Sequence, residues 1–217
     1  MTGRKFSVWE GGTLDVADHW VNAHLLRGQR KFAAKQFAAA LADFQAAENI
    51  PDNLPSDRGG GRGRDAEIAY WIGVAHEASG DADKAKQSWQ SAVSAPNAPA
   101  GRRGFGGGLV SERGVQRYYQ ALAQKKLGRS VEAETALRNL LDAANRVLEQ
   151  GTARGDSPEN VGERQSPRSR AALAHYLAGL AQLGLGETEP AKQQFLLTLQ
   201  FSPDYLGAKT ALAQMGN

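Results

Sequence analysis

Cysteine is absent from the 217 residues of this chain, which excludes disulfides, thiolate nucleophiles and thiolate metal ligands. Long apolar runs are absent too, because no stretch of about 18 apolar residues occurs and polar residues follow Met1 directly. The sequence therefore predicts neither a membrane span nor a secretion signal, and a cytoplasmic location is expected. The hydrophobic content of 41% suffices for a folded domain that buries roughly 70% of its unfolded surface.

Catalytic and metal-binding patterns are also missing. The chain has no Gly-x-Ser-x-Gly elbow, no Walker loop and no dinucleotide-binding fingerprint. His19 and His24 are five residues apart, about 140° around a helix, so they do not share a metal-binding face. His24 and His175 occupy one position of the repeat described below and are expected to be packed, hydrogen-bonded side chains. The sequence predicts a protein that is not an enzyme and holds no metal or cofactor.

What the chain does contain is a spacing that occurs four times. A small residue is followed, twelve positions later, by an alanine: Gly28 and Ala40, Gly73 and Ala85, Ala121 and Ala133, Gly179 and Ala191. Four residues after each alanine comes a large apolar side chain: Phe44, Trp89, Leu137 and Phe195. We interpret each stretch as a helical hairpin in which the alanine faces the small residue, so that the two backbones approach closely.

Glycine marks three of the four expected turns between the paired helices. Gly80, Gly128 and Gly186 are each expected to end a first helix in the left-handed conformation, and an acidic residue such as Asp81 favours the start of the next helix. The first hairpin has Lys35 and Gln36 at this point, so its turn is expected to be made differently.

These hairpins resemble tetratricopeptide repeats. In the second hairpin the resemblance is carried by Ala66, Glu67, Tyr70, Ile72, Gly73, Ala75, Gly80, Asp81, Ala85, Trp89, Ala92 and Pro96. The third hairpin departs from the family at Leu140, where a small residue is usual. The resemblance implies an all-α fold, a right-handed α-solenoid of about four hairpins with long inter-repeat loops and a C-terminal cap helix. The expected bounds are an extended segment at 1–13, one domain at 14–217 with repeats at 20–51, 66–97, 114–150 and 172–203, and a cap helix at 204–215.

The first helices of tetratricopeptide hairpins line a concave groove that binds partners. Carried onto this sequence, the groove positions are Leu25, Gln29, Glu67, Tyr70, Val74, Glu77, Tyr118, Leu122, Lys125, Tyr176 and Leu180. We call this set the first-helix row. The recurring tyrosines suit peptide recognition, because they offer apolar area and a hydroxyl, but tyrosine here also serves packing alone. The Lys and Asn pattern that clamps chaperone carboxylates in some family members is missing.

Three inserted segments separate the hairpins, at 51–65, 96–113 and 151–170. They hold ten arginines and no lysine, with seven acidic residues among them. Arginine favours bidentate contact with carboxylates or phosphates, so an acidic partner or an anion is one reading, with these residues as candidates: Arg62, Arg64, Arg102, Arg103, Arg113, Arg168 and Arg170. Solvated arginines paired with neighbouring acids are the plainer reading. The Arg-Gly runs also look like short RNA-binding segments, although the interleaved acids weaken the positive field and argue against nucleic acid as the partner.

A second resemblance involves the N-terminal part. Trp9-Glu-Gly-Gly12, the stretch from His19 to His24, the segment from Asp65 to Gly80 and the long inserted loops are similar to the C-terminal region of large, carbohydrate-active-enzyme-like bacterial proteins. That resemblance implies an accessory domain facing a catalytic domain of the same system. The main expectation is a non-catalytic scaffold that binds a protein or peptide, with the glycan-enzyme accessory domain and RNA or anion binding as alternatives.

Overall fold

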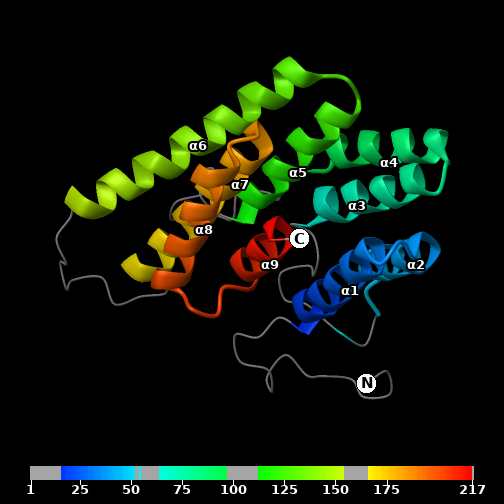
Figure 1. Cartoon of the computed structure of the whole chain (residues 1–217), viewed down its shortest axis with the longest axis horizontal. Coiled ribbons are helices and arrows are strands. Elements are labelled where there is room, and N and C mark those ends of the chain that lie inside the picture. The colour runs from blue at the N-terminus through cyan, green and yellow to red at the C-terminus, as the bar shows by residue number, and fades with distance from the viewer. Residues whose placement is uncertain (1–15, 52–53, 55–63, 97–111, 154–165, 217) are drawn as a thin grey trace. The chain divides into compact units, whose positions relative to one another are not determined.

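The computed structural model describes residues 16–51, 54, 64–96, 112–153 and 166–216, and every regular element in these residues is an α-helix (Figure 1). The helices are α1 (Val16–Ala33), α2 (Phe37–Glu48), α3 (Asp65–Ala78), α4 (Ala82–Ser94), α5 (Glu112–Lys126), α6 (Ser130–Ala153), α7 (Pro167–Leu185), α8 (Thr188–Phe201) and α9 (Leu206–Met215). The all-α prediction is confirmed.

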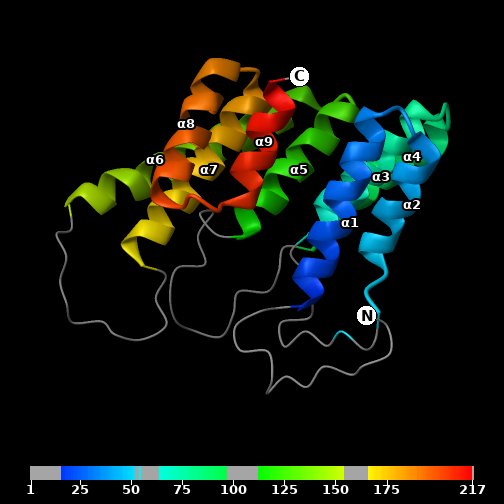
Figure 2. The ribbon, with the colours of Figure 1, turned by 60° about the horizontal axis from the view of Figure 1, so that its bottom comes forward.

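Several pairs of helices that follow one another in the chain pack together. The pairs α1 and α2, α3 and α4, and α7 and α8 lie side by side, and further contacts join α2 to α3, α6 to α7 and α8 to α9 (Figures 1 and 2). The chain forms two compact units. The first contains α1 to α4 together with Leu122–Arg129, and the second contains the earlier part of α5 and everything from α6 onward.

Local sequence explains where the helices begin and end. Ser166 caps α7 by accepting a hydrogen bond from the Ser169 amide at 3.1 Å, and Pro167 occupies the first helical position, where its missing N–H costs nothing. At the other end Gly186 adopts φ 89° and lets the chain leave the helix. Asp81 caps α4 in the same way by accepting from the Lys84 amide at 3.3 Å.

All four turns have a left-handed residue at the same point. Gly80, Gly128 and Gly186 have φ values of 83°, 78° and 89°, as expected, and Lys35 has φ 60°. The expectation that the first turn is made differently is therefore wrong for the backbone. Lys35 takes the glycine conformation although it carries a Cβ, and Gln36 closes the turn by donating its amide to the Lys31 carbonyl at 2.9 Å.

Lys35→Gly is expected to raise the free energy of unfolding by about 1 kcal/mol, because a left-handed conformation costs an L-residue with a Cβ roughly that much. Thermal or urea unfolding measures the change. The matched reverse variant is Gly80→Ala, which introduces a Cβ with no atom within 4 Å and should destabilise by a similar amount through the backbone alone. Equal stability of Lys35→Gly and the parent chain would contradict this assignment.

In three of the hairpins the core is one large aromatic side chain set against a glycine. A Cβ built on Gly28, Gly73 or Gly179 would lie closer than 3.0 Å to the ring sixteen residues further on, respectively Phe44, Trp89 and Phe195. The three atoms nearest to each such Cβ belong to this ring, so the ring fills the space in front of each glycine. That the alanine twelve residues later faces the glycine stays a prediction. The alanines are themselves buried, at 0–1% exposed. The missing side chain of each glycine leaves the space that the aromatic ring occupies.

A cap helix is present, beginning two residues later than expected, at Leu206. Its start is packed against α7: the Tyr176 and Tyr205 rings lie 4.8 Å apart, and a Cβ on Gly207 would meet the Tyr176 ring and hydroxyl. Tyr176 also lies 6.0 Å from the Phe195 ring of α8. The aromatic side chains thus join α7, α8 and α9 within the second unit.

Candidate partner-binding surfaces

The residues of the first-helix row differ in how much of their surface is exposed. Leu25, Glu67, Tyr118 and Leu180 are 1%, 6%, 6% and 4% exposed, so they offer a partner almost no surface. The half-buried members are Gln29, Tyr70, Val74, Leu122 and Tyr176, and the exposed members are Glu77 and Lys125. Partner contact along this row is therefore limited to the half-buried and exposed residues.

Two of the recurring tyrosines pack helices together. Tyr118 is buried, and a Cβ on Gly184 of α7 would lie 3.2 Å from its ring. Tyr176 is held between α8 and α9 by Phe195, Tyr205 and Gly207. Tyr176 fills the space at Gly207, and Leu137 and the Tyr118 ring share the space at Gly184, so both tyrosines serve interhelical packing.

Tyr70 lies differently, at the half-buried face of α3. Its ring meets Trp71 edge-on at 5.7 Å. Burial, with a smaller contribution from the charge of Glu77, raises the pKa of the Tyr70 hydroxyl to about 12. The hydroxyl therefore keeps its proton throughout the physiological range and can donate a hydrogen bond.

The first unit gathers most of the accessible members of the row. Glu77 at the end of α3 forms an ion pair with Lys126 at the end of α5. The Lys126 ammonium also lies 5.2 Å from the Trp89 ring centroid, within the range of a cation–π contact. Gln29, Tyr70, Val74, Leu122 and Lys125 belong to the same unit. It therefore combines apolar, aromatic and charged side chains from three helices.

The candidate anion-binding arginines have different surroundings. Arg64 precedes α3 and donates to Glu67 Oε2 and to Asn22 Oδ1, both at 2.5 Å. Arg168 donates to the carbonyls of Phe201 at 2.6 Å and Gln200 at 3.3 Å, where the C-terminus of α8 favours a cation. The Arg64 guanidinium thus links the start of α3 to α1, and the Arg168 guanidinium links the start of α7 to the end of α8. Arg113 is half-buried and Arg170 exposed, whereas Arg62, Arg102 and Arg103 lie outside the described residues.

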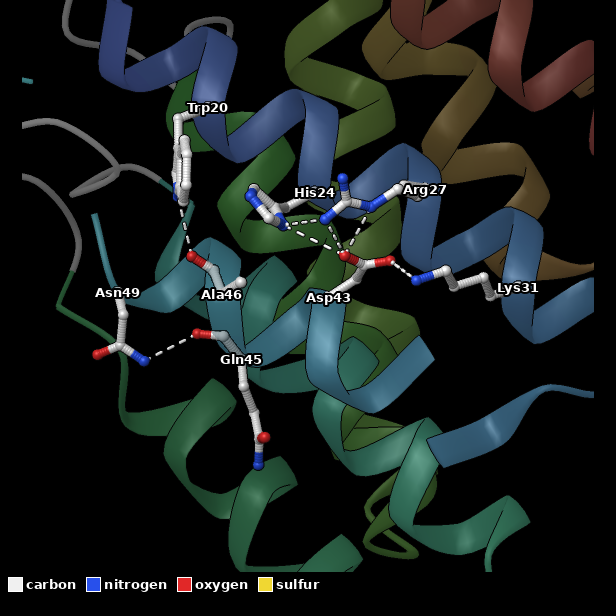
Figure 3. Close-up of polar contacts among 8 residues, drawn as sticks. All are labelled: Trp20, His24, Arg27, Lys31, Asp43, Gln45, Ala46 and Asn49. Carbon is white, nitrogen blue, oxygen red and sulfur yellow. Dashed lines mark hydrogen bonds and ion pairs between the residues drawn. The ribbon is translucent and has the colours of Figure 1, made fainter. Parts of the chain in front are cut away.

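A polar cluster joins α1 to α2 (Figure 3). Asp43 is only 3% exposed. Its Oδ1 accepts a hydrogen bond from Arg27 Nε at 2.7 Å, and its Oδ2 forms an ion pair with Lys31 Nζ at 2.8 Å. Burial alone would raise the pKa of the Asp43 carboxyl, but the bonds from Arg27 and Lys31 outweigh it and hold the pKa at about 2. Asp43 is therefore a carboxylate, and two cations from α1 compensate its burial in α2.

His24 completes this α1–α2 polar cluster. Its Nδ1 lies 3.1 Å from Arg27 Nη2 and 3.3 Å from Asp43 Oδ1. Nδ1 therefore lies within hydrogen-bonding distance of both the guanidinium and the carboxylate. Trp20 stacks at an angle on His24, with centroids 4.3 Å apart, and donates to the Ala46 carbonyl at 2.9 Å (Figure 3). The expectation of a packed, hydrogen-bonded histidine is confirmed; the sequence did not indicate Asp43 as the centre of its network.

His175 confirms the same expectation in the fourth hairpin. Its Nδ1 lies 2.8 Å from Gln194 Oε1, and its ring stacks on Phe201 at 5.3 Å. Both histidines therefore bridge a first helix to its second helix. In the residues that the structure describes, no three histidine, aspartate or glutamate side chains gather as a metal site, and no helix is long and apolar enough to span a membrane.

One hollow was missed by the sequence interpretation. It lies between α5 and α6, has a volume of about 500 Å³, and is lined by Arg117, Val131, Glu132, Thr135, Ala136, Asn139, Leu140 and Arg146. Two features of the sequence could have located it. One is the large Leu140, at a position where tetratricopeptide repeats usually have a small residue. The other is Arg117, which occupies the repeat position of His24 and His175.

The comparison with protein families agrees with the fold. Residues 67–98 match the model of a tetratricopeptide repeat, and they cover nearly all of the α3–α4 hairpin. The match supports a tetratricopeptide family, whose repeats generally mediate protein–protein interaction and are typically non-catalytic. No curated protein matches the chain.

Proposed function

We propose that this chain is a non-catalytic scaffold that binds a protein or peptide along the accessible first-helix row of its first compact unit. The observation that carries the proposal is the tetratricopeptide match on α3 and α4. The first helix of that hairpin presents Tyr70, Val74 and Glu77, which are half-buried or exposed. A partner that covers accessible apolar side chains removes them from water, which favours binding.

The side chains of this surface suit a peptide of mixed character. Val74 and the Tyr70 ring offer apolar area, while the Tyr70 hydroxyl keeps its proton and donates. Glu77 and Lys126 are 48% and 36% exposed, so either can exchange its partner in the ion pair for a charge on a ligand. The arginine-bearing segments add electrostatic selectivity for an acidic partner in this proposal, with Arg168 and Arg170 as the exposed members among the described residues.

Site-specific photo-crosslinking in native cells tests the surface directly. A photoreactive amino acid at position 74 or 77 should capture the same partner, identified by mass spectrometry. The matched controls are positions 83 and 86, which are exposed on α4 of the same hairpin. Capture from 74 and 77 but not from 83 and 86 supports the proposal.

A charge-reversal pair provides the quantitative measurement. Glu77→Lys should weaken binding of the captured partner at least tenfold, about 1.4 kcal/mol, whereas Asp83→Lys makes the same charge change on α4 and should leave affinity within about twofold. Equal effects of the two variants, or equal crosslinking from α3 and α4, would reject the first-helix row as the binding surface.

The two alternative functions rest partly on residues elsewhere. The glycan-enzyme accessory role draws on Trp9 and its neighbours together with the stretches His19–His24 and Asp65–Gly80, and RNA binding draws on the Arg-Gly runs with Arg62, Arg102 and Arg103. Of these, Trp9, Arg62, Arg102 and Arg103 lie outside the described residues. No observation on the described helices favours either alternative over a protein-binding scaffold.

A further inference from the structure

The four hairpins can be compared at one pair of positions across the seam between their two helices. The first position lies four residues before each small residue, and the second lies nineteen residues after the first. The pairs are His24 and Asp43, Ala69 and Ser88, Arg117 and Ala136, and His175 and Gln194. In the first and fourth hairpins this pair is a hydrogen-bonded contact, at 3.3 Å and 2.8 Å.

The second hairpin has no such contact, because Ala69 has no polar side-chain atom, and the third hairpin has only one of the two polar partners. Arg117 provides a permanent cation, but the residue opposite it in register is Ala136, which has no side-chain acceptor. Arg117 is exposed and makes no hydrogen bond or ion pair with any described residue. The 500 Å³ hollow is found here, with both Arg117 and Ala136 in its lining. Its volume is in the range of ligand sites, roughly 300–1,000 Å³.

The remaining lining residues define what the hollow would accept. Arg146 supplies a second guanidinium, and its Nε donates to the Asp142 carbonyl at 3.2 Å. Glu132 supplies one negative charge, so the lining carries a net charge of +1 (two arginines minus one glutamate). Val131, which is 77% exposed, contributes apolar surface beside these charges, whereas Leu140 is 1% exposed and offers a ligand almost none. The combination fits one carboxylate next to an aliphatic group.

We propose that the α5–α6 hollow binds an acidic peptide segment, with the carboxylate of a glutamate or aspartate bound by Arg117 and an adjacent apolar side chain packed on Val131. The ligand carboxylate replaces the acceptor that Asp43 and Gln194 supply in the sibling hairpins. This site is separate from the first-helix row and does not depend on it. A peptide is favoured over nucleic acid because most of the uncharged lining residues are apolar and only two cations line the hollow.

The test uses the full chain and a defined probe, a fluorescein-labelled pentapeptide amide of sequence Gly-Leu-Glu-Leu-Gly, measured by fluorescence anisotropy and by amide chemical-shift changes. We expect saturable binding, with shifts at Ala136 and Asn139. A peptide with Gln in place of Glu should bind at least about tenfold more weakly, because the amide cannot pair with Arg117 as a carboxylate does.

Three variants separate the site from its surroundings. Arg117→Gln removes the cation, and Ala136→Asp installs the acceptor found in the first hairpin; both should weaken binding of the Glu peptide by about tenfold or more. Arg138→Gln is the matched control, because Arg138 lies on the same helix as Ala136, pairs with Glu134 and does not line the hollow. It should change binding by less than about twofold. Ala136→Asp is also informative about folding, because an internal ion pair between Arg117 and the introduced carboxylate should leave the melting temperature unchanged or raised.

Each contrary result overturns the proposal. These are no saturable binding of the Glu peptide up to millimolar concentration, equal binding of the Gln peptide, or equal weakening by Arg138→Gln. Tighter binding of a ten-base oligouridine with the same dependence on Arg117 would assign the hollow to nucleic acid instead. Glu77→Lys on the first-helix row should leave peptide binding unchanged, so failure of the proposed scaffold surface and failure of this site are distinguished.

Discussion

Gly179→Ala is expected to lower the free energy of unfolding by about 1–2 kcal/mol, although alanine is the better helix former. The added Cβ would lie 2.6, 2.8 and 3.1 Å from three atoms of the Phe195 ring, and Phe195 is 0% exposed, so the ring has no space into which to move. Overpacking of this kind costs roughly 1–3 kcal/mol. The gain in helix propensity, about 1 kcal/mol, offsets only part of it.

The third hairpin suggests the compensating change. It has Ala121 where the others have glycine, and Leu137 where they have an aromatic ring, and both residues are 1% exposed. Phe195→Leu should therefore relieve the clash of Gly179→Ala. In a double-mutant cycle the pair should show a favourable coupling of about 1–2 kcal/mol, since residues in contact depart from additivity by this amount.

Chemical unfolding of the parent chain, both single variants and the double variant measures the cycle. Additive effects, or a stabilising Gly179→Ala, would show that the ring and the glycine do not constrain one another. The same test at Gly73 with Trp89→Leu should give the same sign, because a Cβ there also approaches the ring more closely than 3.0 Å.

The periodic part of the fold was predictable because each helix repeats the same local chemistry. Gly80, Gly128 and Gly186 have the expected left-handed turns, and the packed state of His24 and His175 follows from their place among apolar residues. Lys35 could not be predicted, because its conformation is imposed by the two helices that it connects rather than by its own preference. Sequence spacing also could not show that the ring, not the alanine, is nearest to each glycine.

The binding surface was harder to predict than the fold. Tyr70, Tyr118 and Tyr176 occupy one register, yet Tyr118 is buried against Gly184 and Tyr176 is held by α9, while Tyr70 stays half-buried on α3. Tyrosine suits both packing and recognition, so residue type alone does not separate the two roles. Leu140 and Arg117 are sequence signs of the α5–α6 hollow, but what Arg117 lacks is clear only from the nineteen-residue pairing of His24 and His175, which the structure shows.

Asp43→Asn is expected to lower the free energy of unfolding at pH 7 by about 2 kcal/mol. A side-chain amide keeps the shape of the carboxylate but loses its charge, so Arg27 and Lys31 are left without their counterion. The depression of the Asp43 pKa from 3.8 to about 2 sets the scale, because each pKa unit corresponds to about 1.4 kcal/mol. The Asp43 side chain is only 4% exposed, so solvent screens its ion pairs less than it screens pairs at the surface.

The pH dependence distinguishes lost charge from lost packing. A carboxyl whose pKa is lower in the folded chain contributes its full stability above the unfolded pKa, near 3.8, and loses it as pH falls through the folded value, near 2. The difference between parent and Asp43→Asn should thus be constant from pH 7 to about pH 5 and shrink steadily toward pH 2. Asp81→Asn is the matched control, since Asp81 also bonds a lysine three residues on but does so at an exposed helix start, and its effect should be much smaller. A difference for Asp43→Asn that stays constant down to pH 2 would mean that the carboxylate charge does not stabilise the α1–α2 hairpin, and that the cluster acts through shape alone.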